Sequence, residues 1–154
     1  MITRLSLFLS VALLSAPALA AAPAASPTPA EAKAMLDKAV AYYNEHGRKD
    51  ALDAFNKRTP PFSDRNLYVF CIGPDRRLVA DGEYREFIGQ SADILKDASG
   101  KPLGRAFWDI AQKDGQGETH YLFLDPITQR IKPKVSYFSK AGEDVCGVGT
   151  YDPK

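Results

Sequence analysis

The sequence predicts a single α+β domain, with N-terminal helices, a five-stranded antiparallel sheet and a long helical connector between the second and third strands. Two helical segments come first, and runs rich in aromatic and β-branched residues begin only near residue 66. Short links between successive strands favour antiparallel pairing, because parallel strands need long crossovers. Removing a 20-residue leader from the 154 residues leaves a length that suits one domain with one core.

Residues 1–20 are typical of a signal peptide for export. Arg4 supplies a positive start, residues 5–14 form a mostly apolar run, and Ala18-Leu19-Ala20 provides a small-x-small cleavage site. The mature chain is therefore expected to begin at Ala21 and to be periplasmic or secreted. An uncleaved membrane anchor is the alternative, but the apolar run is shorter than the roughly 20 residues that span a bilayer.

The charges of the sequence are balanced, with 20 basic and 19 acidic residues. A nucleic-acid-binding protein would carry a basic stripe, and a membrane-surface protein would carry a polybasic patch. The sequence has neither, so we expect no nucleic-acid partner.

Two cysteines, Cys71 and Cys146, give an even count in a chain expected to be exported. This pattern predicts a disulfide, and two free thiols are the alternative. No histidine lies near either cysteine in sequence and no C-x-x-C motif occurs, so we expect neither a metal site nor a cofactor.

The helices and strands can be placed by their end signals and periodicity. Residues 21–29 form an Ala/Pro-rich linker, after which Thr28, Pro29 and Glu31 give a capping box and a helix that runs to His46. Further helices are predicted over residues 48–57 and 101–113, and strands over residues 67–72, 77–81, 119–125, 134–140 and 144–151.

Eight short motifs, each occurring once, follow one another along residues 30–151. They are Phe55-Asn56, Leu67–Phe70, Leu78–Ala80, Ile88-Gly89, Asp97–Lys101, Tyr121 with Pro126, Pro133–Tyr137 and Cys146–Tyr151. In this order the chain resembles a single Cache domain, the PAS-like extracytoplasmic sensor module of bacterial chemoreceptors and sensor kinases. The resemblance assigns residues 30–154 to one Cache-like domain.

The resemblance also has implications for pairing and for ligand. It implies that the first and last strands are neighbours, which would bring Cys71 and Cys146 together and supports the disulfide independently of the cysteine count. It further implies a pocket beside the sheet that binds a small organic acid. Many similar proteins carry a histidine where this chain has Asp81, which implies a different ligand preference or a disused pocket.

Five residues are the candidate ligand-binding set. Lys134 would supply the cation, and Tyr121 and Tyr137 would supply hydroxyls. Trp108 would supply an apolar wall with an N–H donor. Asp81 stands where many similar proteins have a histidine. Each has a structural alternative: an exposed strand lysine, core aromatic residues and a turn aspartate. Regular strand alternation would place Lys134 and Tyr137 on opposite faces, and Tyr84 and Phe87 should close the connector onto the core.

These observations predict an exported ligand-binding sensor that signals through a membrane sensor or receptor partner, because no second apolar stretch could span a bilayer. The alternative is a structural or interaction module whose pocket is degenerate. An exported hydrolase is a third reading, but the sequence lacks a G-x-S-x-G elbow, an H-E-x-x-H motif and a P-loop. We therefore expect no enzymatic activity.

Overall fold

The computed structural model describes residues 26–151, so the predicted signal peptide and residues 21–25 of the predicted linker lie outside the described residues. The helices are α1 (Pro29–His46), α2 (Arg48–Phe55) and α3 (Gly104–Asp114), with short 3₁₀ turns η1 (Arg85–Phe87) and η2 (Ala92–Ile94). The strands are β1 (Ser63–Asp64), β2 (Leu67–Ile72), β3 (Leu78–Asp81), β4 (Gln116–Asp125), β5 (Arg130–Ala141) and β6 (Asp144–Tyr151). Within residues 26–151, no helix is long and apolar enough to cross a membrane.

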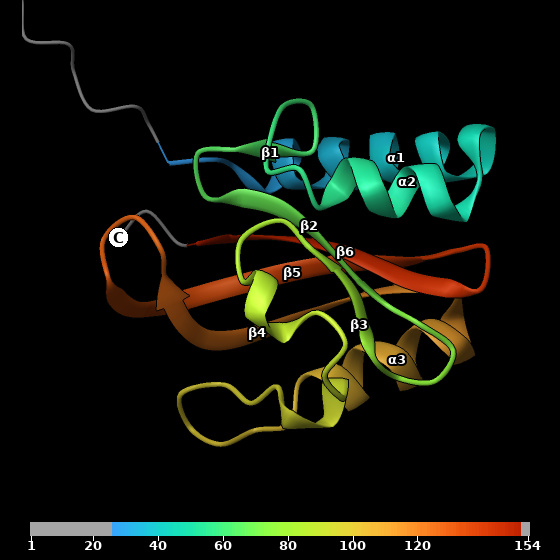
Figure 1. Cartoon of the computed structure of the whole chain (residues 1–154). Helices are drawn as coiled ribbons and strands as arrows, with labels where there is room; N and C mark the ends of the chain where they lie inside the picture. The colour runs from blue at the N-terminus through green and yellow to red at the C-terminus, as the bar shows by residue number, and fades with distance from the viewer. Residues whose placement is uncertain (1–25, 152–154) are drawn as a thin grey trace, which may run out of the picture.

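Helix α1 begins as the sequence predicts. The Thr28 side chain accepts a hydrogen bond from the Glu31 backbone N–H, and the Glu31 carboxylate accepts one from the Thr28 N–H in return. Gly47 ends the helix, and α2 follows at once but is two residues shorter than predicted. Both helices pack on the same face of the sheet (Figure 1).

The strands form an antiparallel sheet in the order β1-β2-β6-β5-β4, and β3 pairs with β2. The first and last long strands, β2 and β6, are therefore neighbours, as the resemblance implies. The sheet has one strand more than predicted, because β1 contains only two residues and has no readable pattern. The α+β architecture with a helical connector between β3 and β4 is confirmed.

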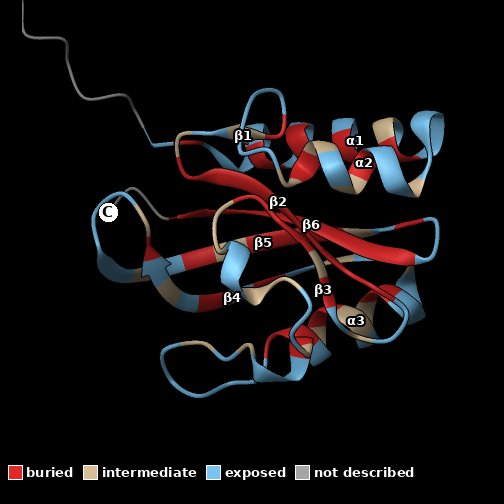
Figure 2. Ribbon diagram, viewed as in Figure 1, coloured by how far each residue is buried: buried red, intermediate tan, exposed pale blue. Residues whose placement is uncertain are grey.

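The sheet divides the molecule into two hydrophobic cores. Helices α1 and α2 cover one face, and α3 with the connector that contains η1 and η2 covers the other (Figure 1). Figure 2 shows that burial is concentrated in β2, β6 and the central part of β5. Residues of β5 alternate between the two cores, with Tyr137 in the first and Phe138 in the second.

The β4–β5 hairpin is longer than the sequence predicts. Residues 126–133 were expected to link the two strands, but β5 already begins at Arg130 and Pro133 lies inside it, paired with Leu122. Among the described residues, Pro133 pairs only with β4, and pairing between β5 and β6 starts at Lys134. Proline within a sheet is typically found at such edge positions.

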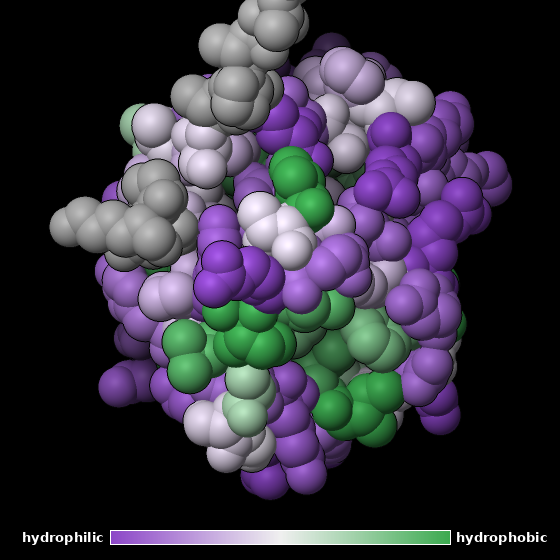
Figure 3. Space-filling model, turned by 90° about the vertical axis from the view of Figure 1, so that its left-hand side faces the viewer, coloured by the Kyte–Doolittle hydropathy of each residue, from purple (hydrophilic) through white to green (hydrophobic). Residues whose placement is uncertain are grey.

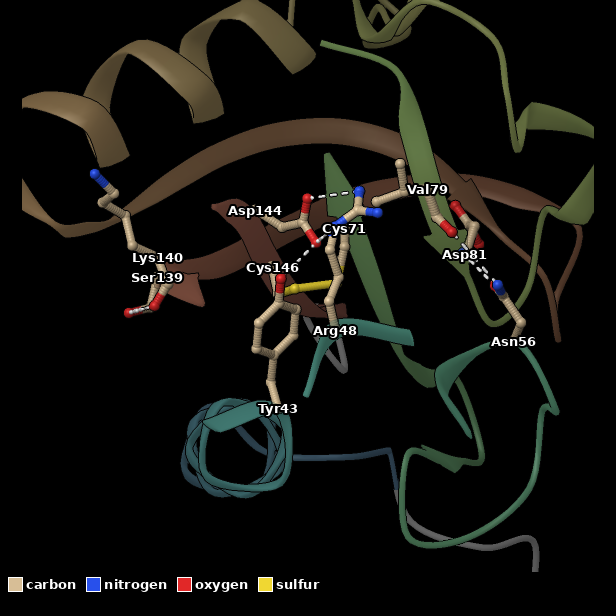
Figure 4. The surroundings of a disulfide bond; sticks show 10 residues. All are labelled: Tyr43, Arg48, Asn56, Cys71, Val79, Asp81, Ser139, Lys140, Asp144 and Cys146. Carbon is tan, nitrogen blue, oxygen red and sulfur yellow. Dashed lines mark hydrogen bonds and ion pairs between the residues drawn. A yellow bond between two sulfur atoms is a disulfide. The ribbon is translucent and has the colours of Figure 1, made fainter. Parts of the chain in front are cut away.

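The predicted disulfide joins Cys71 of β2 to Cys146 of β6, which are direct cross-strand partners with Cα atoms 4.0 Å apart. Beside it, the fully buried carboxylate of Asp144 accepts hydrogen bonds from Tyr43 of α1 and from Arg48 of α2 (Figure 4). The disulfide joins β2 to β6, and the hydrogen bonds to Asp144 attach α1 and α2 to β6.

Candidate functional site

A small cavity lies between the sheet and the connector, on the face that α3 covers. Its volume is about 30 Å³, which corresponds to two or three water molecules. Besides Asp81 and three leucines, its walls are aromatic: Tyr68, Phe70, Tyr84, Phe87, Phe107, Tyr121 and Phe123. Tyr84 and Phe87 belong to the connector, which closes onto the core as predicted.

Asp81 is the one acidic residue of this cavity wall, and only 5% of its surface is exposed. It ends β3 opposite Phe70, and its backbone N–H donates to the Asn56 side chain (Figure 4). Its Oδ1 accepts hydrogen bonds from the backbone N–H groups of Glu83 and Tyr84, at 2.9 and 2.7 Å. Burial raises the pKa of the Asp81 carboxyl above its ordinary value, although the two N–H groups oppose the shift.

Lys134 of β5 is 3% exposed, so the exposed-lysine alternative is wrong. Its side chain crosses β6 above Gly149, where a Cβ atom would lie 2.4 Å from the lysine Cε. Its Nζ donates a 2.8 Å hydrogen bond to the Tyr68 hydroxyl and lies 4.5 to 5.4 Å from the ring centres of Tyr68, Phe123 and Tyr151. Burial lowers the pKa of Lys134 to about 7.

Lys134 does not itself line the cavity. It reaches the cavity through Tyr68, whose hydroxyl accepts from Nζ and therefore keeps its own hydrogen for another acceptor. Among the described residues, no carboxylate lies within ion-pair distance of Nζ. The ammonium group is thus buried among aromatic rings with one hydroxyl as its hydrogen-bond partner.

Of the three remaining predicted site residues, one lines the cavity and two do not. Tyr121 lines the cavity, and its hydroxyl is bonded to that of Ser136 at 2.7 Å. Tyr137 packs in the core on the opposite face of the sheet, as alternation predicts for a regular strand. Trp108 of α3 is half-buried against the second core but is not part of the cavity wall.

Lys134 also borders a second hollow of about 300 Å³, beside the start of α1. This hollow is lined by Pro29, His120 and Thr150, and the Thr150 hydroxyl already donates to the Pro27 carbonyl. We place the candidate site in the aromatic cavity, because two nearly buried polar groups, Asp81 and Tyr68, meet there.

Tyr68 and Gly149 contact Lys134 but are not among the residues that the sequence predicts for the site. Tyr68 lies on the same face of β2 as Phe70, and Cys71 lies on the other, but all six residues of the strand are buried, so the sequence pattern does not single Tyr68 out. A glycine inside a strand signals close approach of another group, and here the approaching group is Lys134.

The model of the family "Single Cache domain 2" matches residues 27–150. The chain belongs to the single Cache domain family. Cache domains are extracytoplasmic sensor domains. Among curated proteins, none matches this chain.

Three solved structures share this Cache fold. A methyl-accepting chemotaxis protein from Vibrio parahaemolyticus RIMD 2210633 is 20% identical with a TM-score of 0.66, over 79% of this chain and 86% of that one. The periplasmic sensor domain of a chemotaxis protein is 22% identical with a TM-score of 0.60, over 77% and 86%. A Cache chemosensory domain described for carboxylic acid recognition is 16% identical with a TM-score of 0.58, over 77% and 84%.

Proposed function

We propose that this Cache domain binds a small organic acid in the aromatic cavity and that a membrane receptor or sensor partner reads the bound state. The observation that carries the proposal is the buried Lys134 ammonium, whose hydrogen-bond partner among the described residues is the cavity hydroxyl of Tyr68. A buried cation without a counter-charge is costly, and a bound carboxylate would offset that cost. Carboxylic acid recognition by another Cache domain supports this ligand class.

In the bound state, Tyr68 donates its hydroxyl hydrogen to the ligand carboxylate while it accepts a hydrogen bond from Lys134. The lysine charge strengthens the donor, because hydrogen bonds that involve ionised groups are about twice as strong as neutral ones. The seven aromatic side chains exclude water and enclose the carbon skeleton of the acid.

Binding has to enlarge the cavity, since even a two-carbon acid has four non-hydrogen atoms and about 30 Å³ accommodates two or three water molecules. The wall that can move is the connector, which contributes Tyr84, Phe87 and Leu95 from irregular segments and 3₁₀ turns. A partner that contacts the connector would detect this change, and the ligand would favour the expanded conformation. Export through the predicted signal peptide, with cleavage near Ala20, completes this proposal, in which the protein is no enzyme.

The test is isothermal titration of the mature chain, from Ala21, with acetate, propionate and lactate. We expect saturable binding that Lys134→Met abolishes and Tyr68→Phe weakens about tenfold or more. Lys140→Met, at an exposed position of the same strand, should bind like the wild type. Equal binding by the wild type and Lys134→Met would refute the role of Lys134, and no binding by any acid would refute the ligand class.

A structural or interaction module with a degenerate pocket is the second candidate. The small cavity volume favours it, and so does an exposed hydrophobic surface on the β4–β5 hairpin. The exposed residues there are Leu122, Leu124, Ile127 and Ile131, and Figure 3 shows hydrophobic side chains gathered on this end of the molecule. This candidate is preferred if no small acid binds and if charged substitutions in the hairpin weaken binding to a receptor ectodomain.

A further inference from the structure

The β4–β5 hairpin carries an exposed hydrophobic patch. Among the residues that the structure describes, five large hydrophobic side chains are exposed, and four of them form this hairpin patch: Leu122, Leu124, Ile127 and Ile131. Leu124 pairs with Ile131 across the strands and Leu122 pairs with Pro133, so these side chains lie on one face of the sheet. Ile127, in the turn, is 62% exposed. A contiguous patch of this kind marks a surface that contacts a protein or a membrane.

Helix α1 does not reach the hairpin patch. It packs on Tyr137, on the same face of the sheet, but it begins at Pro29, which borders one hollow together with Pro133. Figure 1 shows the hairpin extending past the first turn of α1, and Figure 3 shows hydrophobic side chains on that end of the molecule. The patch is therefore open to a partner from outside residues 26–151.

Both ends of the described chain lie beside the hairpin. The Pro27 carbonyl accepts a hydrogen bond from Thr150 in β6, and Tyr151, the last described residue, donates its hydroxyl hydrogen to the Leu124 carbonyl. Residues 21–25 separate the described chain from the predicted signal peptide, and a chain of this length spans at most about 20 Å. A signal peptide in the membrane would therefore hold the hairpin end of the molecule close to the bilayer.

The turn of the hairpin presents no uncompensated negative charge. The Asp125 carboxylate accepts hydrogen bonds from the Ile127 N–H and the Thr128 hydroxyl, and it lies 3.3 Å from the Lys132 ammonium. On the patch side of β4, the nearest exposed carboxylate is that of Glu118, at the other end of the strand. An anionic surface can therefore approach the turn without meeting a carboxylate.

Basic side chains flank the patch instead. Arg130, in the hairpin, is exposed and has no ion-pair partner among the described residues. The Ala98 N–H donates a hydrogen bond to the Leu122 carbonyl, which places the connector loop with its exposed Lys96 and Lys101 beside the hairpin. These basic residues are far apart in the sequence, so they form no basic run, and only the fold brings them to one end of the molecule.

We propose that the β4–β5 hairpin docks on an anionic phospholipid bilayer, with Ile127 and Ile131 inserted at the headgroup boundary and Arg130 on the lipid phosphates. The hairpin patch is aliphatic throughout, whereas protein interfaces are enriched in aromatic residues and methionine, so a bilayer is the better match. Anionic lipids attract basic side chains near the membrane surface. Docking would keep the exported domain at the membrane, and it does not depend on a ligand in the aromatic cavity.

The test is flotation of the mature chain, from Ala21, with vesicles of phosphatidylcholine alone or of an equal mixture with phosphatidylglycerol. We expect the mixture to bind the protein and high salt to weaken the binding. Ile127→Ser combined with Ile131→Ser should lower the partition coefficient about tenfold or more. Arg130→Gln should lower it about fivefold for the mixture only. Ile94→Ser, an exposed isoleucine outside the hairpin, is the matched control and should bind like the wild type.

The hairpin side chains are exposed, so thermal unfolding of these variants should match the wild type and show that any loss of binding is local. Absence of wild-type binding to both kinds of vesicle would overturn the proposal, and so would equal binding by the double isoleucine variant. If the hairpin instead binds a receptor ectodomain and no vesicle, the partner is a protein and the membrane proposal is wrong. Titration of the same variants with small acids keeps this result separate from the proposed ligand.

Discussion

Lys134→Met should make the domain more stable at neutral pH, because it removes a charge that the fold buries at a cost. The pKa of Lys134 falls from 10.5 to about 7 on burial, so the folded state loses this proton more readily than the unfolded state. Below pH 7 the lysine is protonated in both the folded and the unfolded state, so it makes no contribution to the pH dependence of stability. Between pH 7 and 10.5 the unfolded state binds more protons, and stability rises with pH.

The size of this effect follows from the pKa difference. Each pKa unit corresponds to about 1.4 kcal/mol, so protonation of Lys134 costs the fold about 4 kcal/mol at pH 7 and about 1 kcal/mol at pH 9.5. The wild type should therefore gain about 3 kcal/mol over this range, or about 10 °C in Tm for a domain of this size. The measurements stop at pH 9.5. Above that pH, the raised pKa values of Tyr68, Tyr121 and Tyr151 make the stability fall as pH rises.

The assay is urea unfolding followed by circular dichroism at pH 7.0, 8.0, 9.0 and 9.5, without ligand. Lys134→Met should be more stable than the wild type at pH 7, and the difference should shrink as pH rises. Lys140→Met, an exposed change on the same strand, should keep the wild-type slope. Parallel curves for wild type and Lys134→Met would refute the reasoning, since the buried amine would then not be the titrating group.

Three further changes test the framework around the site. Replacing Cys71 and Cys146 together by alanine should cost about 4 kcal/mol, from the 75-residue separation that the disulfide closes; a loss below about 1 kcal/mol in urea unfolding would contradict this. Gly147→Ala should cost about 2 kcal/mol, because its Cβ would lie 2.4 Å from Phe70; unchanged Tm would show that the ring moves freely. Asp144→Ala should cost about 2 kcal/mol, because the Tyr43 hydroxyl loses its acceptor while Arg48 keeps its ion pair with Glu143; a neutral result would show that the contact is dispensable.

Local signals predict the elements of this fold well. The Thr28–Glu31 capping box and Gly47 determine where α1 begins and ends, since both act through bonds or dihedral angles within a few residues. The sequence places the second strand of the β4–β5 hairpin at residues 134–140, after Pro133, whereas the strand begins at Arg130. Whether a proline breaks a strand depends on which neighbour pairs with it, and that information is not local.

The candidate site could be predicted only in part, for a similar reason. Lys134 and Asp81 stand out in sequence because charged residues are unusual inside or at the end of apolar strands. Tyr68 does not stand out, since it lies in the wholly buried run of β2, where hydrophobicity shows no alternation. Its contact with Lys134 spans 66 positions and depends on Gly149, so only the assembled sheet brings the pair together.

The structure gives the cavity one fixed wall and one adaptable wall. Tyr68 lies on β2, which the disulfide fastens to β6, the strand that Lys134 crosses, so the hydroxyl and the ammonium keep their separation. Tyr84 and Phe87 come from the connector, where 3₁₀ turns replace the strand ladder, although the Tyr84 hydroxyl still donates to the Leu124 carbonyl. Asp81 lies at the junction of the two walls, with its backbone on β3 and its Oδ1 holding the first turn of the connector. A ligand that enlarges the cavity would therefore move the connector relative to the sheet at Asp81, where β3 ends and the connector begins.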